Sequence, residues 1–201
     1  MVTPREMVRI SGGLAIDPMR EDDVATVQAI EKEIFTTPWP RNAYQRELAS
    51  KNSAHYIVLR RDEPEAGIQS EIVGYGGMWR MYDEAHVTTI GVRQDLQHQG
   101  LGRVLFSALV QASYDMGAKW ITLEVRVSNS GAQRMYEGFG FKVIGRRRGY
   151  YTDNGEDALV MWSDSIFSPR FRSAFDQNLE WIGREVRGLR REVMPPEGMI
   201  P

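Results

Sequence analysis

The chain has 201 residues, with 25 Lys and Arg against 27 Asp and Glu, no Cys and 42% hydrophobic residues. This length favours one domain with an appendage, and the lack of Cys excludes disulfides, thiolate metal sites and a Cys nucleophile, so no metal is expected. The net charge of −2 excludes a globally basic DNA-binding protein. No apolar run reaches the ~20 residues of a membrane span, and a reducing cytoplasmic location is expected.

The first half of the chain predicts a leader followed by short helices and strands. Residues 1–13 mix Pro, Gly and scattered charges and are interpreted as a flexible leader. An acidic turn at 20–23, followed by apolar residues at intervals of three or four, predicts a helix that ends at 37–40. The other elements predicted here are a strand over 14–19, a helix over 44–48, strands over 55–60, 72–81 and 85–92, and a charged turn over 62–70.

The second half alternates strands with helices. Its predicted elements are a loop over 93–100, a helix over 101–116, a strand over 119–127, a helix over 131–138, and strands over 141–147 and 157–162. Strands joined first by hairpins and then by helices indicate a mixed sheet with helices packed on it, which is an α/β or layered α+β fold.

The C-terminal segment, residues 164–201, is predicted to be a helical extension. Seven apolar residues repeat every three or four positions between 168 and 193, and arginines occupy the opposite face: the apolar residues are Phe171, Phe175, Leu179, Ile182, Val186, Leu189 and Val193. We favour an amphipathic helix docked on its own domain. A homodimer contact and a basic surface facing a ribosome or RNA are the alternatives.

Two glycines lie between a predicted strand and a predicted helix, at Gly100 and Gly102. Glycine lets a backbone approach a ligand closely, and the first N–H groups of a helix attract phosphate, so this loop is a candidate pyrophosphate site. The pattern is Gln-x-x-Gly-x-Gly. Leu105 replaces the third glycine of a dinucleotide fold, and no P-loop pattern is present. Glycines that serve only packing are the alternative.

Two further segments contain candidate catalytic groups. In the strand at 120–127, Glu124 shares a face with Trp120, Thr122 and Arg126, while apolar residues form the other face. The simple alternative is a strand with one wetted face. Tyr136 lies on the short helix that follows, where an aromatic side chain ordinarily belongs to the core.

Taken together, these segments resemble the GCN5-related N-acetyltransferases (GNAT), and within them the RimI branch. The resemblance covers about residues 15–163, an expected GNAT domain over 14–163, and leaves the leader and the extension outside. The segments that carry it are Gln97 to Arg103, Leu123 to Arg126, Ser128-Asn129, Met135 to Glu137, Gly140-Phe141, Arg147 to Tyr151 and Gly155 to Ala158.

The resemblance implies a mostly antiparallel twisted sheet with helices on both faces, and acetyl-CoA as co-substrate. Glu124 matches the family's general base and Tyr136 its general acid. The resemblance implies that the backbone of Ile90, Gly91 and Val92 would pair with the pantetheine arm of acetyl-CoA. The pyrophosphate would be held by the backbone amides of His98, Gln99, Gly100, Leu101, Gly102 and Arg103. Asn129 would make a further contact with the cofactor. The implied acceptor is the N-terminal alanine amine of bacterial small-subunit ribosomal protein eighteen.

The chemistry of these residues agrees with N-terminal acetylation. An α-amino group with a pKa near 7.7–8.0 is neutral in about one molecule in seven at pH 7, so a modest base suffices. Direct attack in a ternary complex is expected because the chain has no Cys. His98 lies in the candidate loop, where it would contact phosphate or solvent, whereas His55 and His86 are interpreted as strand residues.

Two alternatives remain open. The first is an acetyltransferase of the same fold that acts on another amine, namely a different protein N-terminus, a lysine or a small molecule. The second is a non-catalytic acetyl-CoA-binding module associated with the ribosome. Acidic residues near the expected acceptor side would suit a basic peptide, with an ordinary solvated surface as the alternative: they are Glu31, Glu33, Asp83, Glu84, Asp153, Glu156 and Asp157.

Overall fold

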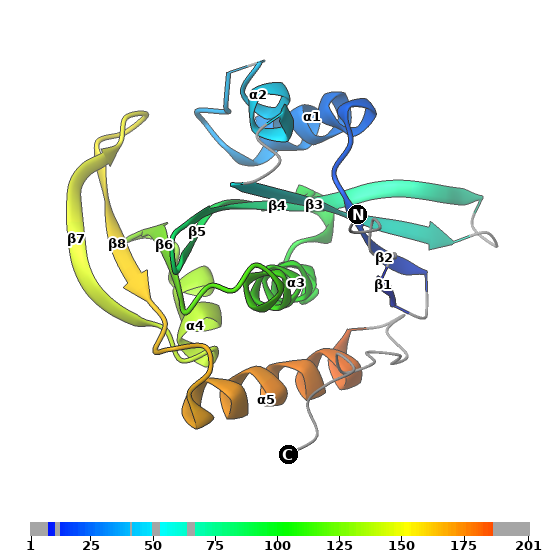
Figure 1. The fold of residues 1–201 in the computed structure, drawn as a ribbon. Helices are drawn as coiled ribbons and strands as arrows, with labels where there is room; N and C mark the ends of the chain where they lie inside the picture. The colour runs from blue at the N-terminus through cyan, green and yellow to red at the C-terminus, as the bar shows by residue number, and fades with distance from the viewer. Residues whose placement is uncertain (1–7, 11–12, 41, 50–52, 64–66, 187–201) are drawn as a thin grey trace.

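A computed structural model describes residues 8–10, 13–40, 42–49, 53–63 and 67–186 (Figure 1). One eight-stranded sheet, in the order β1-β2-β3-β4-β5-β6-β8-β7, forms its centre. The strands are β1 (Val8–Ile10), β2 (Leu14–Pro18), β3 (Ala54–Glu63), β4 (Ile68–Met81), β5 (Glu84–Val92), β6 (Trp120–Arg126), β7 (Lys142–Tyr151) and β8 (Glu156–Trp162). Among the helices of the described residues, none is long and apolar enough to cross a membrane.

The sheet is antiparallel except at one place. The strands from β1 to β5 pair antiparallel in chain order, and β5 then pairs in parallel with β6 because a helix connects the two. The final hairpin returns β8 between β6 and β7, again antiparallel. The mixed, mostly antiparallel sheet expected from the sequence is confirmed.

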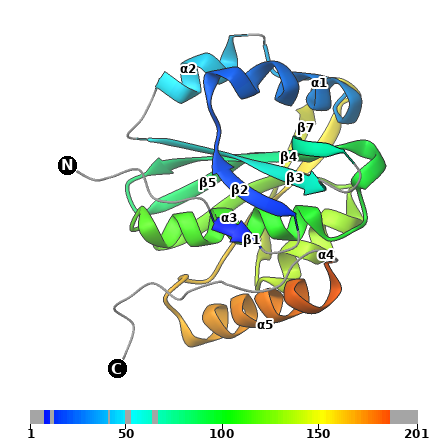
Figure 2. The same ribbon diagram turned by 90° about the vertical axis from the view of Figure 1, so that its right-hand side faces the viewer.

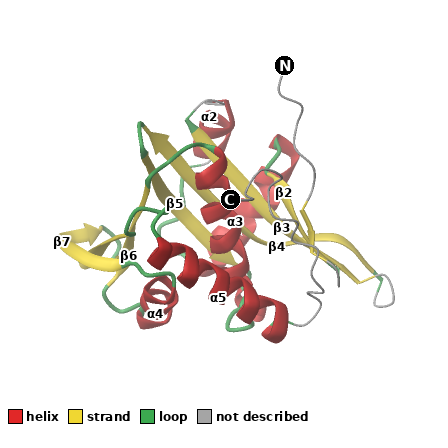
Figure 3. Ribbon diagram, turned by 60° about the horizontal axis from the view of Figure 1, so that its bottom comes forward, coloured by secondary structure: helices red, strands yellow, loops and turns green. Residues whose placement is uncertain are grey.

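Helices cover both faces of the sheet, as expected (Figures 1 and 2). On one face lie α1 (Val24–Ile34) and α2 (Ala43–Ala49), which bury Val27 and Tyr44. On the other lie α3 (Leu101–Asp115), α4 (Ser130–Gly138) and α5 (Pro169–Glu185); in Figure 3 these three helices stand in front of the sheet. Leu105 and Phe106 of α3 are completely buried in the larger of the two cores.

The parallel pair β5–β6 opens toward the C-terminal ends of the strands. The ladder joins Glu84 to Val87 with Trp120 to Leu123 and ends there. From Gly91 and Val92, β5 continues paired with β4 alone, while β6 from Glu124 onward pairs with β8. At Gly91 and Val92, one edge of β5 therefore has no strand partner, directly before the loop that contains the two glycines.

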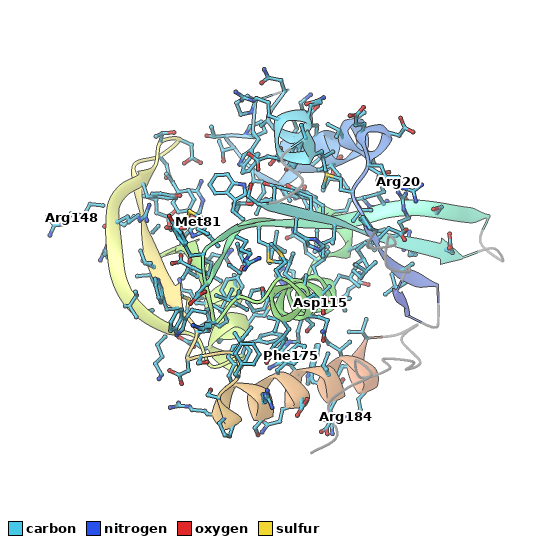
Figure 4. All side chains as sticks on the ribbon, viewed as in Figure 1. Arg20, Met81, Asp115, Arg148, Phe175 and Arg184 are labelled. Atoms are coloured by element: carbon cyan, nitrogen blue, oxygen red, sulfur yellow. The ribbon has the colours of Figure 1, made fainter. Side chains whose placement is uncertain are left out.

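Helix α5 docks on its own domain, which confirms the favoured interpretation of the extension. The Ser168 hydroxyl accepts a hydrogen bond from the Phe171 N–H at 3.2 Å and caps the helix, and Pro169 occupies its first turn. The apolar seam, including Phe171 and Ile182, is buried against the larger core, and Figure 4 shows Phe175 between α5 and α3, where its ring contacts Tyr114. A homodimer through this helix would have to use its arginine-bearing face. Leu189 and Val193 lie outside the described residues.

The structure differs from the expected elements at a few boundaries. Val8–Ile10 form a strand paired with β2, so the leader prediction is wrong for these three residues, while 1–7 and 11–12 lie outside the described residues. Gly13, at φ +91°, makes the turn between them. The turn expected over 62–70 is shorter, because β3 and β4 stay paired as far as Glu63 and Ile68. A 3₁₀ turn over Glu21–Asp23 precedes α1.

Candidate active site

Glu124 lies on β6 where β5 and β6 begin to separate, with its side chain only 6% exposed. Its Oε2 lies 3.0 Å from Nε2 of His86 on β5, and its Oε1 lies 3.0 Å from a guanidinium nitrogen of Arg147 on β7. Three strands therefore hold one carboxylate. Oε1 is buried without hydrogen-bond geometry to any donor among the described residues, although the charge of Arg147 is close. This oxygen is therefore the one that does not contact His86, and it faces the Arg147 guanidinium.

The electrostatic setting favours the ionised form of this carboxyl. Burial by itself raises the pKa of Glu124, but the hydrogen bond and charge that His86 supplies when its imidazole is protonated, together with the charge of Arg147, outweigh it and hold the pKa below its usual range. Glu124 is therefore a carboxylate at neutral pH, able to orient an amine by accepting a hydrogen bond.

His86 lies on a strand, β5, as the sequence predicted, and it contacts the Glu124 carboxylate. Its Nδ1 lies 2.9 Å from the Thr122 hydroxyl, which donates to Oε1 of Glu84 at 2.8 Å. The indole of Trp79 stacks on the imidazole at 6.3 Å between ring centroids. Neither His86 nor Arg147 was identified as a partner of Glu124 from the sequence. The alternation that puts Thr122 and Glu124 on one face of β6 is the only signal that pointed to this cluster.

Tyr136 of α4 is buried in an aromatic cluster. Its ring contacts Phe106 at 4.9 Å and Phe141 at 6.2 Å between centroids, and no hydrogen bond joins its hydroxyl to another described residue. Burial, and then the neighbouring Tyr151, raise the pKa of its hydroxyl above the ordinary value, so the phenol stays protonated. Burial is the main cause that raises the pKa of Tyr151 to about 12, and the charge of Glu124 also raises it. Tyr151 thus connects the two candidate catalytic residues electrostatically.

The open edge of β5 fits a ligand that pairs like a strand. Ile90, Gly91 and Val92 pair with β4 on one side and have no β6 partner on the other. The Val92 carbonyl accepts a hydrogen bond from Gln97 Nε2 at 3.1 Å. A Cβ on Gly91 would lie 2.5 Å from a ring carbon of Tyr75, so this glycine is required by packing on the α1 side and not by a ligand.

The loop before α3 presents a row of unbonded amides. His98 at φ +60° and Gly100 at φ +85° give it two left-handed residues, and the N–H groups from His98 to Gly102, including those of Gln99 and Leu101, have no acceptor among the described residues. Such a turn at a helix N-terminus matches a pyrophosphate. The Arg103 N–H already bonds the Gly100 carbonyl at 3.0 Å, so the expected role of that amide is not favoured.

The two glycines of this loop serve different purposes. A Cβ on Gly100 would lie 2.9 Å from a methyl carbon of Val186 and 3.0 Å from the Trp181 indole, so α5 packs directly on it. A Cβ on Gly102 would meet only the Met135 sulfur at 3.9 Å. Gly102 therefore faces open space, whereas Gly100 is required for the approach of the chain's own C-terminal helix as well as for its backbone conformation.

Arg103 connects this loop to α5. Its guanidinium stacks 4.3 Å above the Trp181 ring and donates to Asn178 Oδ1 at 2.5 Å. Burial lowers its pKa, and no carboxylate among the described residues pairs with it. Asn178 in turn donates to the Gly138 carbonyl of α4 at 2.8 Å, so α5 joins α3 to α4. Asn129, expected to contact the cofactor, caps α4 by accepting the Ala132 N–H at 3.0 Å.

The acidic residues suggested for peptide recognition are mostly used inside the chain. Asp153 and Glu156 both pair with Arg126, at 2.8 and 3.1 Å, and Asp157 pairs with Arg146 at 2.5 Å. Glu31 is buried and accepts from the Tyr44 hydroxyl at 3.0 Å, with a pKa raised by burial. These carboxylates therefore do not form a free acidic surface. Across the described ranges, no group of three His, Asp or Glu side chains could hold a metal ion.

Comparison with known proteins agrees with this geometry. The profile of the acetyltransferase (GNAT) family matches residues 24–141. A Bacillus subtilis protein with the provisional name ribosomal protein bS18-alanine N-acetyltransferase is 40% identical over 148 residues, 74% of this chain and 93% of that protein. The Mycobacterium tuberculosis N-alpha-acetyltransferase RimI is 34% identical over 158 residues, 76% of this chain and 93% of that protein.

A solved structure supports the same assignment. The crystal structure of the ribosomal-protein-S18-alanine N-acetyltransferase from Escherichia coli superposes with a TM-score of 0.67 and 28% identity, covering 78% of this chain and 97% of that one. The family profile ends before β7, so α5 lies beyond it. The resemblance to the RimI branch is confirmed, and the chain belongs to the GNAT family of acetyl-CoA-dependent N-acetyltransferases.

Proposed function

We propose that the protein is an N-alpha-acetyltransferase that acetylates the N-terminal alanine of a small-subunit ribosomal protein, homologous to bS18, by direct attack in a ternary complex. The observation that carries the proposal is the buried Glu124 carboxylate, which is held by His86 and Arg147 and keeps one oxygen free of hydrogen bonds. The names of the bacterial relatives supply the acceptor.

Acetyl-CoA, when bound, supplies the acetyl thioester. The open edge of β5 at Ile90, Gly91 and Val92 suits the amides of a pantetheine arm, and the unbonded N–H groups from His98 to Gly102 suit its pyrophosphate. Both features supply backbone groups that this co-substrate can bond. Asn129 at the start of α4 has its amide nitrogen available for a further contact.

Glu124 and Tyr136 divide the proton transfers between them. Glu124 accepts a proton from the attacking amine, directly or through one water, because its Oε1 lacks a donor. Tyr136 keeps its proton, since burial raises its pKa, and donates it to the sulfur that leaves. A thiol has a pKa near 8.5, below that of a phenol, so this proton transfer is coupled to the breaking of the carbon–sulfur bond, and the phenolate that forms must be reprotonated.

The proposal is tested by following CoA release with two basic peptides. One has a free N-terminal Ala and no Lys, and the other has a blocked N-terminus and one internal Lys. We expect release with the first peptide alone. Release with the second alone would retain the fold and overturn the acceptor. Silence with both peptides, in protein that binds acetyl-CoA by calorimetry, would overturn the peptide substrate altogether.

A further inference from the structure

A chain of hydrogen bonds extends from Glu124 along β5 and β6. The parallel register places His86 opposite Thr122. The contacts run from Glu84 Oε1 to the Thr122 hydroxyl at 2.8 Å, from that hydroxyl to His86 Nδ1 at 2.9 Å, and from His86 Nε2 to Glu124 Oε2 at 3.0 Å. All three contacts lie within hydrogen-bonding distance, which sets the position of each proton.

The donor inventory fixes the tautomer of His86. An ionised Glu84 only accepts, so the single hydroxyl proton of Thr122 points to Glu84. Toward His86 the same hydroxyl can only accept, and Nδ1 must therefore carry a proton. The neutral imidazole consequently has its free lone pair on Nε2, facing Glu124.

The contact between Nε2 and Glu124 has two protonation forms. With a proton between them, the two atoms make a charge-assisted hydrogen bond. Without it, a lone pair of Nε2 faces a carboxylate oxygen. Groups this close lose protons as a pair and not individually. The form without the shared proton is a stronger base than an isolated carboxylate, because protonation restores the hydrogen bond.

We propose that His86 and Glu124 act as one base in acetyl transfer, with His86 as the positioning residue that finally holds the proton. This inference rests on the proposed function. As the amine nitrogen bonds to the acetyl carbon and loses its proton, the proton goes to the Glu124 carboxylate. Rotation of the carboxyl group then presents the proton to His86 Nε2. The carbon–sulfur bond breaks, Tyr136 protonates the sulfur, and the imidazolium returns its proton to the phenolate through solvent.

The surroundings of the pair favour this division. Arg147 from β7 lies against Glu124 Oε1 and stabilises the carboxylate form, while Trp79 from β4 covers the imidazole face. Burial, and then the charge of Glu124, raise the pKa of Tyr150, whereas the charge of Arg147 lowers it. A carboxylate oxygen of Glu47 on α2 accepts a hydrogen bond from the indole N–H of Trp79. With Nδ1 protonated, Nε2 carries the lone pair of the ring, so a proton on the carboxyl group has an acceptor 3.0 Å away.

The decisive experiment is the pH dependence of kcat/KM between pH 5.5 and 9 for an Ala-initiated peptide. In the wild type, log(kcat/KM) should fall toward acid with slope two, one from the peptide amine and one from the His86–Glu124 pair. His86→Gln keeps hydrogen-bonding atoms but does not titrate, so the slope should become one. We expect kcat to fall by about tenfold or more at pH 8 in this variant, with the Kd for acetyl-CoA unchanged.

His55→Gln is the matched control, because His55 lies on β3 outside the site, and it should retain slope two. Slope two in His86→Gln, or slope one in the wild type, would overturn the inference. A different result tests the proposed function: wild-type turnover in Glu124→Gln would show that Glu124 is not the general base. Loss in Glu124→Gln with an unchanged His86→Gln profile removes only the role of His86.

A spectroscopic measurement tests the tautomer without turnover. The ¹⁵N chemical shifts of the neutral His86 imidazole should show the proton on Nδ1. The His86 signals are assigned as those that are missing from the spectrum of His86→Gln. In Thr122→Val the hydroxyl acceptor is lost while the shape is kept, and the proton should move toward Nε2. A neutral His86 protonated on Nε2 in the wild type would contradict the hydrogen-bond direction on which the inference depends.

Discussion

The two ends of the candidate site are stabilised in different ways. The catalytic end is a polar network of Glu84, His86, Thr122, Glu124 and Arg147, linked by directional contacts across β5, β6 and β7. The cofactor loop, residues 97–103, is instead held from behind by packing of α5 on Gly100 and Arg103. We therefore expect changes in the polar network to act on the chemical step, and changes in α5 to act on acetyl-CoA binding.

Glu124→Gln should give the largest effect. The amide keeps the size of the side chain but cannot accept the amine proton, so kcat should fall by about 10²–10⁴-fold. The acetyl-CoA Kd should remain within a factor of about two, because Glu124 contacts His86 and Arg147 and no residue of the cofactor loop. Pre-steady-state acetyl transfer and calorimetry measure the two quantities. Near-wild-type turnover would exclude Glu124 as the base.

Tyr136→Phe should lower kcat by about 10²-fold or more, because the departing thiolate then takes its proton from solvent. The ring contacts with Phe106 and Phe141 do not involve the hydroxyl, so the unfolding midpoint should stay unchanged. The structure provides a discriminating control in Tyr44→Phe, whose hydroxyl bonds Glu31 on the other face of the sheet. A loss of activity in the control equal to that in Tyr136→Phe would remove the acid role.

Trp181→Ala tests the other end of the comparison. It removes the ring under Arg103 and part of the wall behind Gly100. A half-buried Trp replaced by Ala should cost about 2 kcal/mol in the free energy of unfolding. The acetyl-CoA Kd should rise by roughly tenfold, about 1.4 kcal/mol, with kcat at saturation changed little.

Trp120→Ala is the control for this prediction. Trp120 is 38% exposed at the start of β6, and the Lys119 ammonium lies 5.9 Å from the centroid of its ring. Its replacement should leave the acetyl-CoA Kd unchanged. If Trp181→Ala destabilises the protein without weakening acetyl-CoA binding, α5 is a stabilising helix only, and the contrast between the two ends of the site disappears.

The sequence alone predicted much of the fold but only part of this contrast. The glycine spacing and the alternation around Glu124 identified both ends, since each is a local pattern. The contact between His86 and Glu124 depends on the parallel register of strands that are far apart in the chain, and no local pattern contains that register. The apolar seam of α5 predicted docking, but not that Trp181 and Val186 would contact Gly100, because a seam does not specify its partner surface.

The smallest expected effect lies at the rim of the polar network. The hydrogen bonds from Ser128, and then the interaction with Arg126, lower the pKa of Glu156 to about 2 from an ordinary value of 4.5. A carboxyl whose pKa is depressed on folding stabilises the protein above its unfolded pKa, and this contribution is lost as the pH falls from about 4.5 toward 2. Because Glu156 is at the surface, the change should be small and salt-sensitive.

Urea unfolding of the wild type and Glu156→Gln at pH 7 and pH 3 measures this effect. The gap in unfolding midpoint between the two proteins should be present at pH 7 and smaller at pH 3. Glu137→Gln, an exposed carboxyl on α4, is the matched control and should show no such gap. Equal gaps at both pH values would mean that Glu156 acts through its shape and not its charge.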